Sequence, residues 1–299
     1  MFESLSKNAY DAYKRASVRL FGNFTDRVIG NFKSLKKNML GASINVLLKT
    51  WVSMIFLSTL LAYASTLITM SALAFFFALE AVTSFYIIAL VPLLVAASVF
   101  FVLYIYPMQK CRSVQKSIEL NIPFAMSHMN AIVSSGIPPE FMFELLMGFE
   151  EYGEIANQSK QVVRNIKTFG MSSVSAINDV AKKTPSEDFR NILTGISSTI
   201  EKGGNLVNYI KDVSDMALFN YRIKREKYMK TLSTYADIYT ALLVAAPLMM
   251  IAILGIMGII GGEVLGLTIQ ELMLLMTWIV LPVLNMSFLA FVHITHPGV

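Results

Sequence analysis

The sequence predicts an all-α polytopic membrane protein, with four transmembrane helices in two hairpins and a cytoplasmic helical-bundle domain. Three observations lead to this prediction. The 299 residues are 55% hydrophobic and only 15% charged, whereas a soluble domain carries about 25% charged residues. The apolar residues are concentrated in long uncharged runs. The 25 lysines and arginines all lie outside these runs.

The first fifty residues are basic and contain predicted amphipathic helices. Phe24, Val28 and Phe32 recur at helical spacing, with basic residues between them. The N-terminus lacks the apolar core of a signal peptide, so we expect the internal segments to direct insertion. A basic amphipathic helix can lie on an anionic membrane surface or pack on the cytoplasmic domain, and the sequence leaves both readings open.

Four stretches are long and apolar enough to cross a bilayer, which takes roughly 20 mostly apolar residues. Prolines inside the last three are tolerated in membrane helices, usually with a kink. The connections within each pair are short, with Glu80 as the charge in the first and a glycine-rich turn in the second. Each pair therefore forms a hairpin. The predicted spans are residues 51–77, 82–106, 238–260 and 272–292.

The basic residues also predict the orientation. Nine of them lie in residues 1–50, sixteen in residues 110–230 and none in the short hairpin loops. Since cytoplasmic loops carry an excess of lysine and arginine, the N-terminus, the central segment and the C-terminus are all expected in the cytoplasm. The predicted domains are cytoplasmic helices (1–50), a first hairpin (51–107), a cytoplasmic bundle (108–235), a second hairpin (236–292) and a short cytoplasmic tail (293–299).

The central segment reads as helices separated by breaks. Turn and capping residues predict where each helix begins and ends, and no breaker follows Asn205 until Pro247. One long helix is therefore expected to run from the bundle into the third span. The other expected signals are a helix start at Pro123, a start at Pro138-Pro139, a break at Glu150–Gly153, a helix over 156–168, a cap at Ser172 or Ser173, a cap at Ser186 and an end at Gly203-Gly204.

Three glycines recur at intervals of 34 residues, at Gly136, Gly170 and Gly204. Each precedes an amphipathic helix, which a repeated helix-hairpin unit would explain. Ordinary helix caps explain the spacing as well and are the favoured interpretation.

The chain lacks the common sequence motifs of catalytic and metal-binding sites. It contains no P-loop, HExxH, CxxC or GxSxG motif, and His128 stands alone as a core or surface histidine. We therefore predict that the chain is not an enzyme and has no cofactor or metal. No basic stripe with base-stacking aromatics and no nucleic-acid-binding motif occurs, so we predict no nucleic-acid partner either. The lone Cys111 lies near a span end, where palmitoylation occurs, but a bystander thiol is the favoured interpretation. The spans hold almost no ionisable residue, which argues against an ion-coupled carrier.

Several short motifs, taken in order, resemble the F domain of type II secretion systems. They are Ile122-Pro123-Phe124, Ser134–Pro138, Gly170–Ser173, Lys183–Ser186 and Glu201–Leu206 with Tyr209. The Thr-Pro-Ser and Gly-Gly-Asn-Leu elements are most similar to the archaeal branch, the platform proteins of archaella and archaeal pili. The resemblance covers about residues 110–292. It implies a non-enzymatic membrane platform at the base of a type IV-like filament, with one F domain where some relatives have two.

The resemblance also implies partners: a cytoplasmic secretion ATPase, pilin or archaellin subunits, the lipid bilayer, and a second copy of the chain or a second platform subunit. Membrane lipid head groups are the competing partner for the basic cluster among the candidate contact residues. A small-molecule transporter or channel subunit is the alternative function, and a membrane-bound enzyme is a third. The candidate contacts are Gly136, Pro138, Glu140, Glu150, Glu151, Glu154, Arg222, Lys224, Arg225, Lys227 and Lys230.

Overall fold

The computed structural model describes residues 2–44, 46–76, 81–261, 263–264 and 266–295. These residues form helices, except for one short β-hairpin whose two strands have two residues each. The chain divides into two units, Met1–Asp215 and Met216–Val299. Four helices are long and apolar enough to cross a membrane, and they lie within Leu48–Leu73, Ile88–Ser134, Leu206–Ile259 and Ile269–Ile294. The predicted all-α fold with four membrane-spanning helices is confirmed, and the chain is a multi-pass membrane protein. Glu80 and the end of the tail lie outside the described residues.

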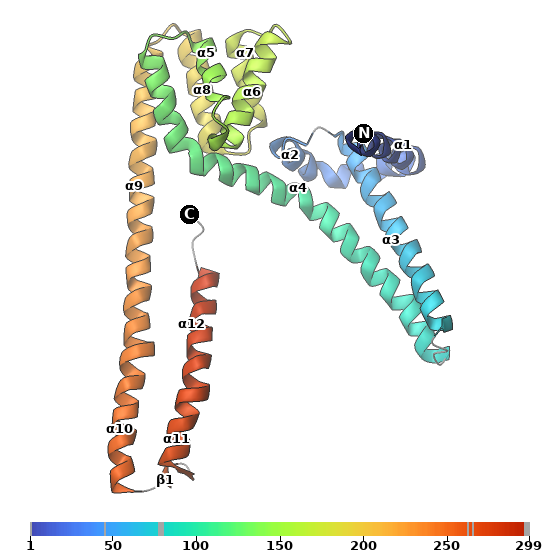
Figure 1. The fold of residues 1–299 in the computed structure, drawn as a ribbon. Helices are drawn as coiled ribbons and strands as arrows, with labels where there is room; N and C mark the ends of the chain where they lie inside the picture. The colour runs from blue at the N-terminus through green and yellow to red at the C-terminus, as the bar shows by residue number, and fades with distance from the viewer. Residues whose placement is uncertain (1, 45, 77–80, 262, 265, 296–299) are drawn as a thin grey trace. The chain divides into compact units, whose positions relative to one another are not determined.

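The first hairpin consists of α3 (Leu48–Phe76) and α4 (Ala81–Ser134), which lie side by side in Figure 1. α4 continues for 54 residues, from the membrane span into the bundle. The predicted helix start at Pro123 is wrong, because α4 passes through it unbroken. A mid-helix proline costs about 3 kcal/mol, and burial of the neighbouring Ile122, Ala125 and Met126 against the bundle offsets this cost.

The N-terminal helices pack on the first hairpin. α1 (Phe2–Val28) contacts α3, and after a 3-10 turn (η1, Ile29–Phe32) α2 (Lys33–Gly41) contacts α4. Gly41 lies so close to Cys111 and Pro185 that a Cβ there would be 2.8 Å from the Cys111 sulfur. The described α1 therefore packs on the first span, while α2 reaches the turn before α8. A small core joins η1 and α2 to α3, and it contains Phe32, Leu35, Met39 and Val52.

In the bundle, the end of α4 contacts α5 (Pro139–Leu146), η2 (Glu150–Tyr152), α6 (Glu154–Lys167) and α8 (Glu187–Glu201). α7 (Ser173–Lys183) packs on α6 and α8. The expected caps are present: the Ser172 hydroxyl accepts from the Ser175 amide and the Ser186 hydroxyl from the Phe189 amide. A fully buried core holds the bundle together. It includes Met126, Met129, Phe143, Leu146, Ile155, Ile177, Phe189, Leu193 and Ile196.

The expected long helix is confirmed. α9 (Leu206–Tyr239) continues through a π-helical segment, η3 (Thr240–Ala245), into α10 (Ala246–Ile260). The described part of the turn contains β1 (Glu263–Val264) and β2 (Leu267–Thr268), and the chain returns through α11 (Ile269–Leu275), a second π segment, η4 (Met276–Val280), and α12 (Leu281–Thr295). Figure 1 colours this second unit orange to red.

Both π segments have the same physical cause. A proline ring clashes with the carbonyl four residues earlier and offers no N–H, and local π adjustment accommodates this in membrane helices. Pro247 and Pro282 have Leu243 and Trp278 at that position, and these two residues lie inside η3 and η4. The two helices of the second hairpin also meet through Tyr239, whose hydroxyl donates to the Asn285 side chain at 3.4 Å.

Candidate functional site

Three turns at one end of the bundle contain glycines in the left-handed region. Gly136, Gly170 and Gly203 have φ of 81°, 65° and 67°, and each follows the C-terminus of a helix. Their amides close the preceding helices by bonding to carbonyls of Val133, Ile166 and Ile200. Such geometry is that of ordinary C-caps, the interpretation favoured for the spacing of 34, with Gly203 rather than Gly204 as the left-handed residue of the third turn.

The first of these turns carries two candidate contact residues. Gly136 and Pro138 are exposed, and Pro138 precedes α5 with an extended backbone. A methyl group added to Gly136 would meet nothing within 4 Å. This turn therefore has open backbone at its surface. Glu140 belongs to the first turn of α5, but its side chain lies outside the described ones.

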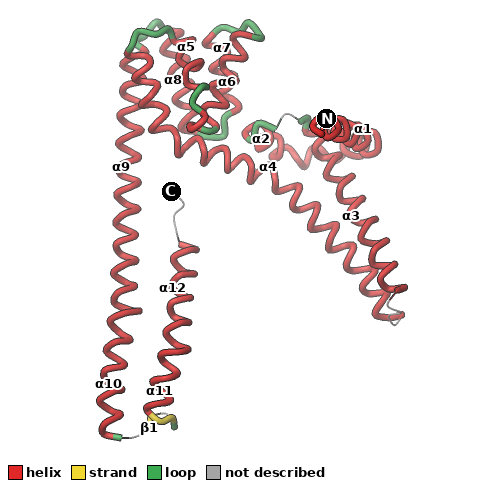
Figure 2. The backbone as a smooth tube through the Cα atoms, in the orientation of Figure 1, coloured by secondary structure: helices red, strands yellow, loops and turns green. Residues whose placement is uncertain are grey.

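The acidic turn, residues 149–154, lies at the opposite end of the bundle, as the loops in Figure 2 show. Glu150 and Glu151 are exposed and Glu154 is half-buried. The turn is fastened to α4 at one side, where the Glu154 amide donates to the Ser117 hydroxyl at 3.4 Å. Gly153 has φ of 53°, and a Cβ there would lie 2.8 Å from the same hydroxyl. Glycine is thus required at this position both by the backbone and by the close approach of α4.

An aromatic cluster fastens the acidic turn at its other side. His128 of α4 shares a 3.0 Å hydrogen bond with the Tyr152 hydroxyl through Nδ1, and its ring lies 4.2 Å from that of Phe149. Burial and the neighbouring Glu151 carboxylate raise the pKa of Tyr152. The phenol therefore stays neutral at physiological pH and keeps its hydrogen bond. In the sequence His128 is an isolated histidine. No local signal indicates that it contacts Phe149 and Tyr152, which follow it by 21 and 24 residues.

The basic cluster, Arg222, Lys224, Arg225, Lys227 and Lys230, lies on α9 in the second unit. All five side chains are exposed. Lys230 pairs with Glu226 at 2.9 Å, and the Arg225 guanidinium donates to the Tyr221 hydroxyl at 3.3 Å. Water screens exposed contacts of this kind, so they hold the side chains only weakly. The cluster is thus mainly a solvated positive surface.

The structure does not bring the candidate residues of the first unit together. The turn between α4 and α5, which contains Gly136 and Pro138, lies at one end of the bundle, and the acidic turn between α5 and α6 lies at the other (Figure 2). They define two separate surfaces, and the basic cluster defines a third on its own unit. Within the described residues, no group of three or more metal-ligating side chains occurs. What these three surfaces offer chemically is therefore exposed charge and exposed backbone.

Comparison with known proteins shows what the bundle and the helix after it resemble. Residues 125–254 match the model of the family described as type II secretion system (T2SS), protein F. This segment includes the bundle core from Ala125, all of α5 to α9 and most of α10. The resemblance expected from the motifs is thus confirmed: residues 125–254 are similar to the type II secretion F domain.

Three curated relatives come from archaea. An uncharacterized protein of Methanocaldococcus jannaschii is 21% identical over 135 residues, covering 45% of this chain and 23% of the relative. A flagella accessory protein J of Methanococcus voltae is 20% identical over 137 residues, covering 46% and 25%. A flagella accessory protein J of M. jannaschii is 24% identical over 92 residues, covering 31% and 16%. The match spans a quarter or less of each relative's length. No solved structure gives a significant match.

Proposed function

We propose that this protein is the membrane platform of a type IV-like filament machine, an archaellum or a pilus, and couples a cytoplasmic secretion ATPase to movement of pilin subunits. The observation that carries the proposal is an F domain joined to membrane spans by unbroken helices. α4 enters the bundle directly from the second span, and α9 leaves it directly for the third. The names of the archaeal relatives support the filament setting.

Helix continuity supplies a means of transmitting motion. The helix from Leu206 to Ile259 has 54 residues, which at 1.5 Å per residue makes it about 80 Å long. Its first turns are anchored in the bundle, where Ile210 and Ser214 are buried and the Tyr209 hydroxyl donates to the Ile192 carbonyl at 3.3 Å. A push on the bundle would thus reach the third span without crossing a flexible linker.

The orientation in this proposal rests on the basic residues. Sixteen of the 25 lysines and arginines lie in residues 110–230 and nine in the first fifty. The positive-inside rule then puts the bundle and both termini in the cytoplasm. Only on that side can the bundle meet an ATPase supplied with cytosolic nucleotide.

The three charged or open surfaces are the proposed partner contacts. The acidic turn supplies exposed carboxylates, the Gly136–Pro138 turn supplies open backbone, and the basic cluster supplies positive charge beside the membrane. Charge of this kind raises association rates and selects partners of opposite charge. A second copy of the chain or a second platform subunit is proposed to complete the assembly, and the protein itself is proposed to have no catalytic activity.

Charge reversal tests the ATPase contact. We expect Glu150→Lys with Glu151→Lys to abolish copurification of the secretion ATPase and to reduce the number of filaments per cell. Asp212→Lys with Asp215→Lys is the matched control, because both aspartates are exposed and the change in net charge is the same. If both double variants bind the secretion ATPase equally well, the acidic turn is not part of the ATPase interface.

Two further measurements test the function as a whole. Deletion of the gene should eliminate filaments while the pilin-like subunits remain in the membrane. A tag placed beside Lys183 should be reached only after the cells are opened. A tag accessible from outside the cell, or solute flux through liposomes containing the purified chain alone, would contradict the platform role and favour a transporter.

A further inference from the structure

α1 crosses α3 at the level where the first span begins. The Tyr13 hydroxyl donates to the Met54 carbonyl at 3.1 Å, and the buried Thr25 and Ser53 hydroxyls share a 3.0 Å hydrogen bond. At the same level Trp51 stacks on Tyr106 at 5.9 Å. Tryptophan and tyrosine are enriched at membrane–water interfaces. These contacts therefore hold α1 against α3 at the level of this aromatic pair.

One side of α1 is apolar and exposed. Leu20 and Phe24 are 66% and 52% exposed, and Tyr13 shares their side of the helix by its spacing of seven from Leu20. Tyr13 and Phe24 contact residues of α3 beyond its first turn: Phe24 packs edge-on against Phe56 at 5.2 Å. The exposed apolar side thus faces the direction in which α3 enters the membrane.

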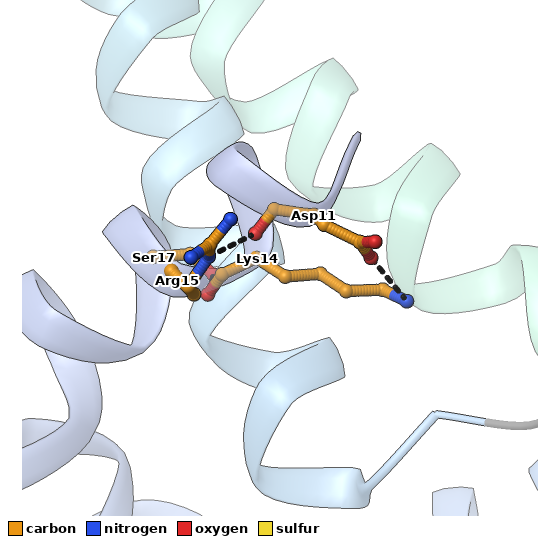
Figure 3. Close-up of polar contacts among 4 residues, drawn as sticks. All are labelled: Asp11, Lys14, Arg15 and Ser17. Carbon is orange, nitrogen blue, oxygen red and sulfur yellow. Dashed lines mark hydrogen bonds and ion pairs between the residues drawn. The ribbon is translucent and has the colours of Figure 1, made fainter. Parts of the chain in front are cut away.

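The other side of α1 is charged and faces the opposite direction. Asp26 pairs with Lys49, at the start of α3, at 2.7 Å. Arg15 and Arg19 share the side of Asp26 by helical spacing and are exposed. Figure 3 shows the Arg15 side chain bonded through Nε to the Asp11 carbonyl, at 3.3 Å. The same view includes the Lys14–Asp11 ion pair, at 3.8 Å. The Ser17 hydroxyl donates a hydrogen bond to the Lys14 carbonyl.

From this arrangement we propose that α1 is an interfacial helix that binds the anionic head groups of the bilayer that α3 enters. Leu20 and Phe24 insert at the boundary between head groups and acyl chains, as the apolar face of such helices does. Arg15 and Arg19 contact lipid phosphates from the aqueous side. Arg27, exposed beside Leu20, reaches the head groups with its long side chain. The inference rests on the membrane span and not on the platform role.

Depth-dependent quenching tests the insertion. The Cys111→Ser change removes the chain's only cysteine. Into this full-length protein a new cysteine is introduced by Leu20→Cys or by Arg19→Cys, and the new thiol is labelled with a fluorophore. The labelled protein is reconstituted in vesicles of equal parts phosphatidylcholine and phosphatidylglycerol. Spin-labelled lipid should quench the Leu20→Cys label severalfold more than the Arg19→Cys label, and aqueous iodide should show the reverse. Equal iodide quenching at both positions, or protection of both from both quenchers by a protein contact, would overturn the insertion.

Lipid selectivity tests the charge. With the label from Leu20→Cys, spin-labelled phosphatidylglycerol should quench more strongly than spin-labelled phosphatidylcholine. The preference should fall by about fivefold for each arginine removed in Arg15→Gln, Arg19→Gln and Arg27→Gln. The matched control is Lys182→Gln, Lys202→Gln and Lys211→Gln, three exposed lysines of the bundle and α9. A preference that survives the arginine changes, or falls equally in the control, would refute head-group binding by α1.

Discussion

The phenol of Tyr209 on α9 lies directly over Gly195 on α8, so that a methyl group at Gly195 would overlap the ring. The Tyr209 hydroxyl also donates to the Ile192 carbonyl at 3.3 Å. A residue without a side chain on one helix thus receives an aromatic ring from the next. This contact fastens the long helix to α8 of the bundle at the point where α9 begins.

Gly195→Ala should therefore destabilise the protein. Overpacking at such a site costs about 1–3 kcal/mol, and the loss should appear as a lower midpoint in thermal unfolding of the detergent-solubilised chain. Tyr209→Ala in the same background removes the overlapping ring. The two changes should then combine to less than the sum of their separate effects. Strict additivity would mean that the two residues do not contact each other.

Gly153→Ala should cost more stability than Gly136→Ala. Both glycines have positive φ, which costs an alanine roughly 1–2 kcal/mol, but only the Gly153 substitution also meets the Ser117 hydroxyl at 2.8 Å. Chemical denaturation of the two variants measures the difference. Ser117→Ala should partly rescue Gly153→Ala and should not rescue Gly136→Ala. Equal destabilisation by the two alanines would contradict the close approach of α4.

Thr25→Val should leave the Ser53 hydroxyl buried and unpaired between α1 and α3, since the two hydroxyls bond to each other at 3.0 Å. An unsatisfied buried hydroxyl costs about 1–3 kcal/mol. Adding Ser53→Ala removes the orphaned group, so the double variant should be closer to the parent in unfolding midpoint than Thr25→Val alone. A double variant that is less stable than the single one would indicate that the hydroxyls are not a closed pair.

Tyr152 should ionise at higher pH than an ordinary tyrosine. Burial raises its pKa, and the Glu151 carboxylate raises it further. Because the folded-state pKa exceeds the unfolded one, the stabilisation is present below the unfolded value, about 10, and is lost as pH rises through the folded value. Tyrosinate absorbance of the parent minus that of Tyr152→Phe isolates this titration. Glu151→Gln should move it to lower pH, and an unchanged curve would show that the carboxylate is not involved.

Local signals in the sequence determined much of the secondary structure. A run of apolar residues or a capping serine acts within a turn or two of its own position, so the four spans and the caps at Ser172, Ser186 and Asn205 could be predicted without knowing the fold. The confirmed long helix after Asn205 follows from the same kind of signal, the lack of a breaker before Pro247.

The tertiary structure decided what depends on the meeting of distant faces. Pro123 has the local signature of a helix start, yet α4 passes through it because neighbouring residues are buried against the bundle. The packing of α1 on α3 and the contacts of His128 likewise depend on which surfaces meet after folding. The sequence therefore determined the helices and their caps, whose energies are local, whereas contacts between helices arise from packing that no short segment encodes.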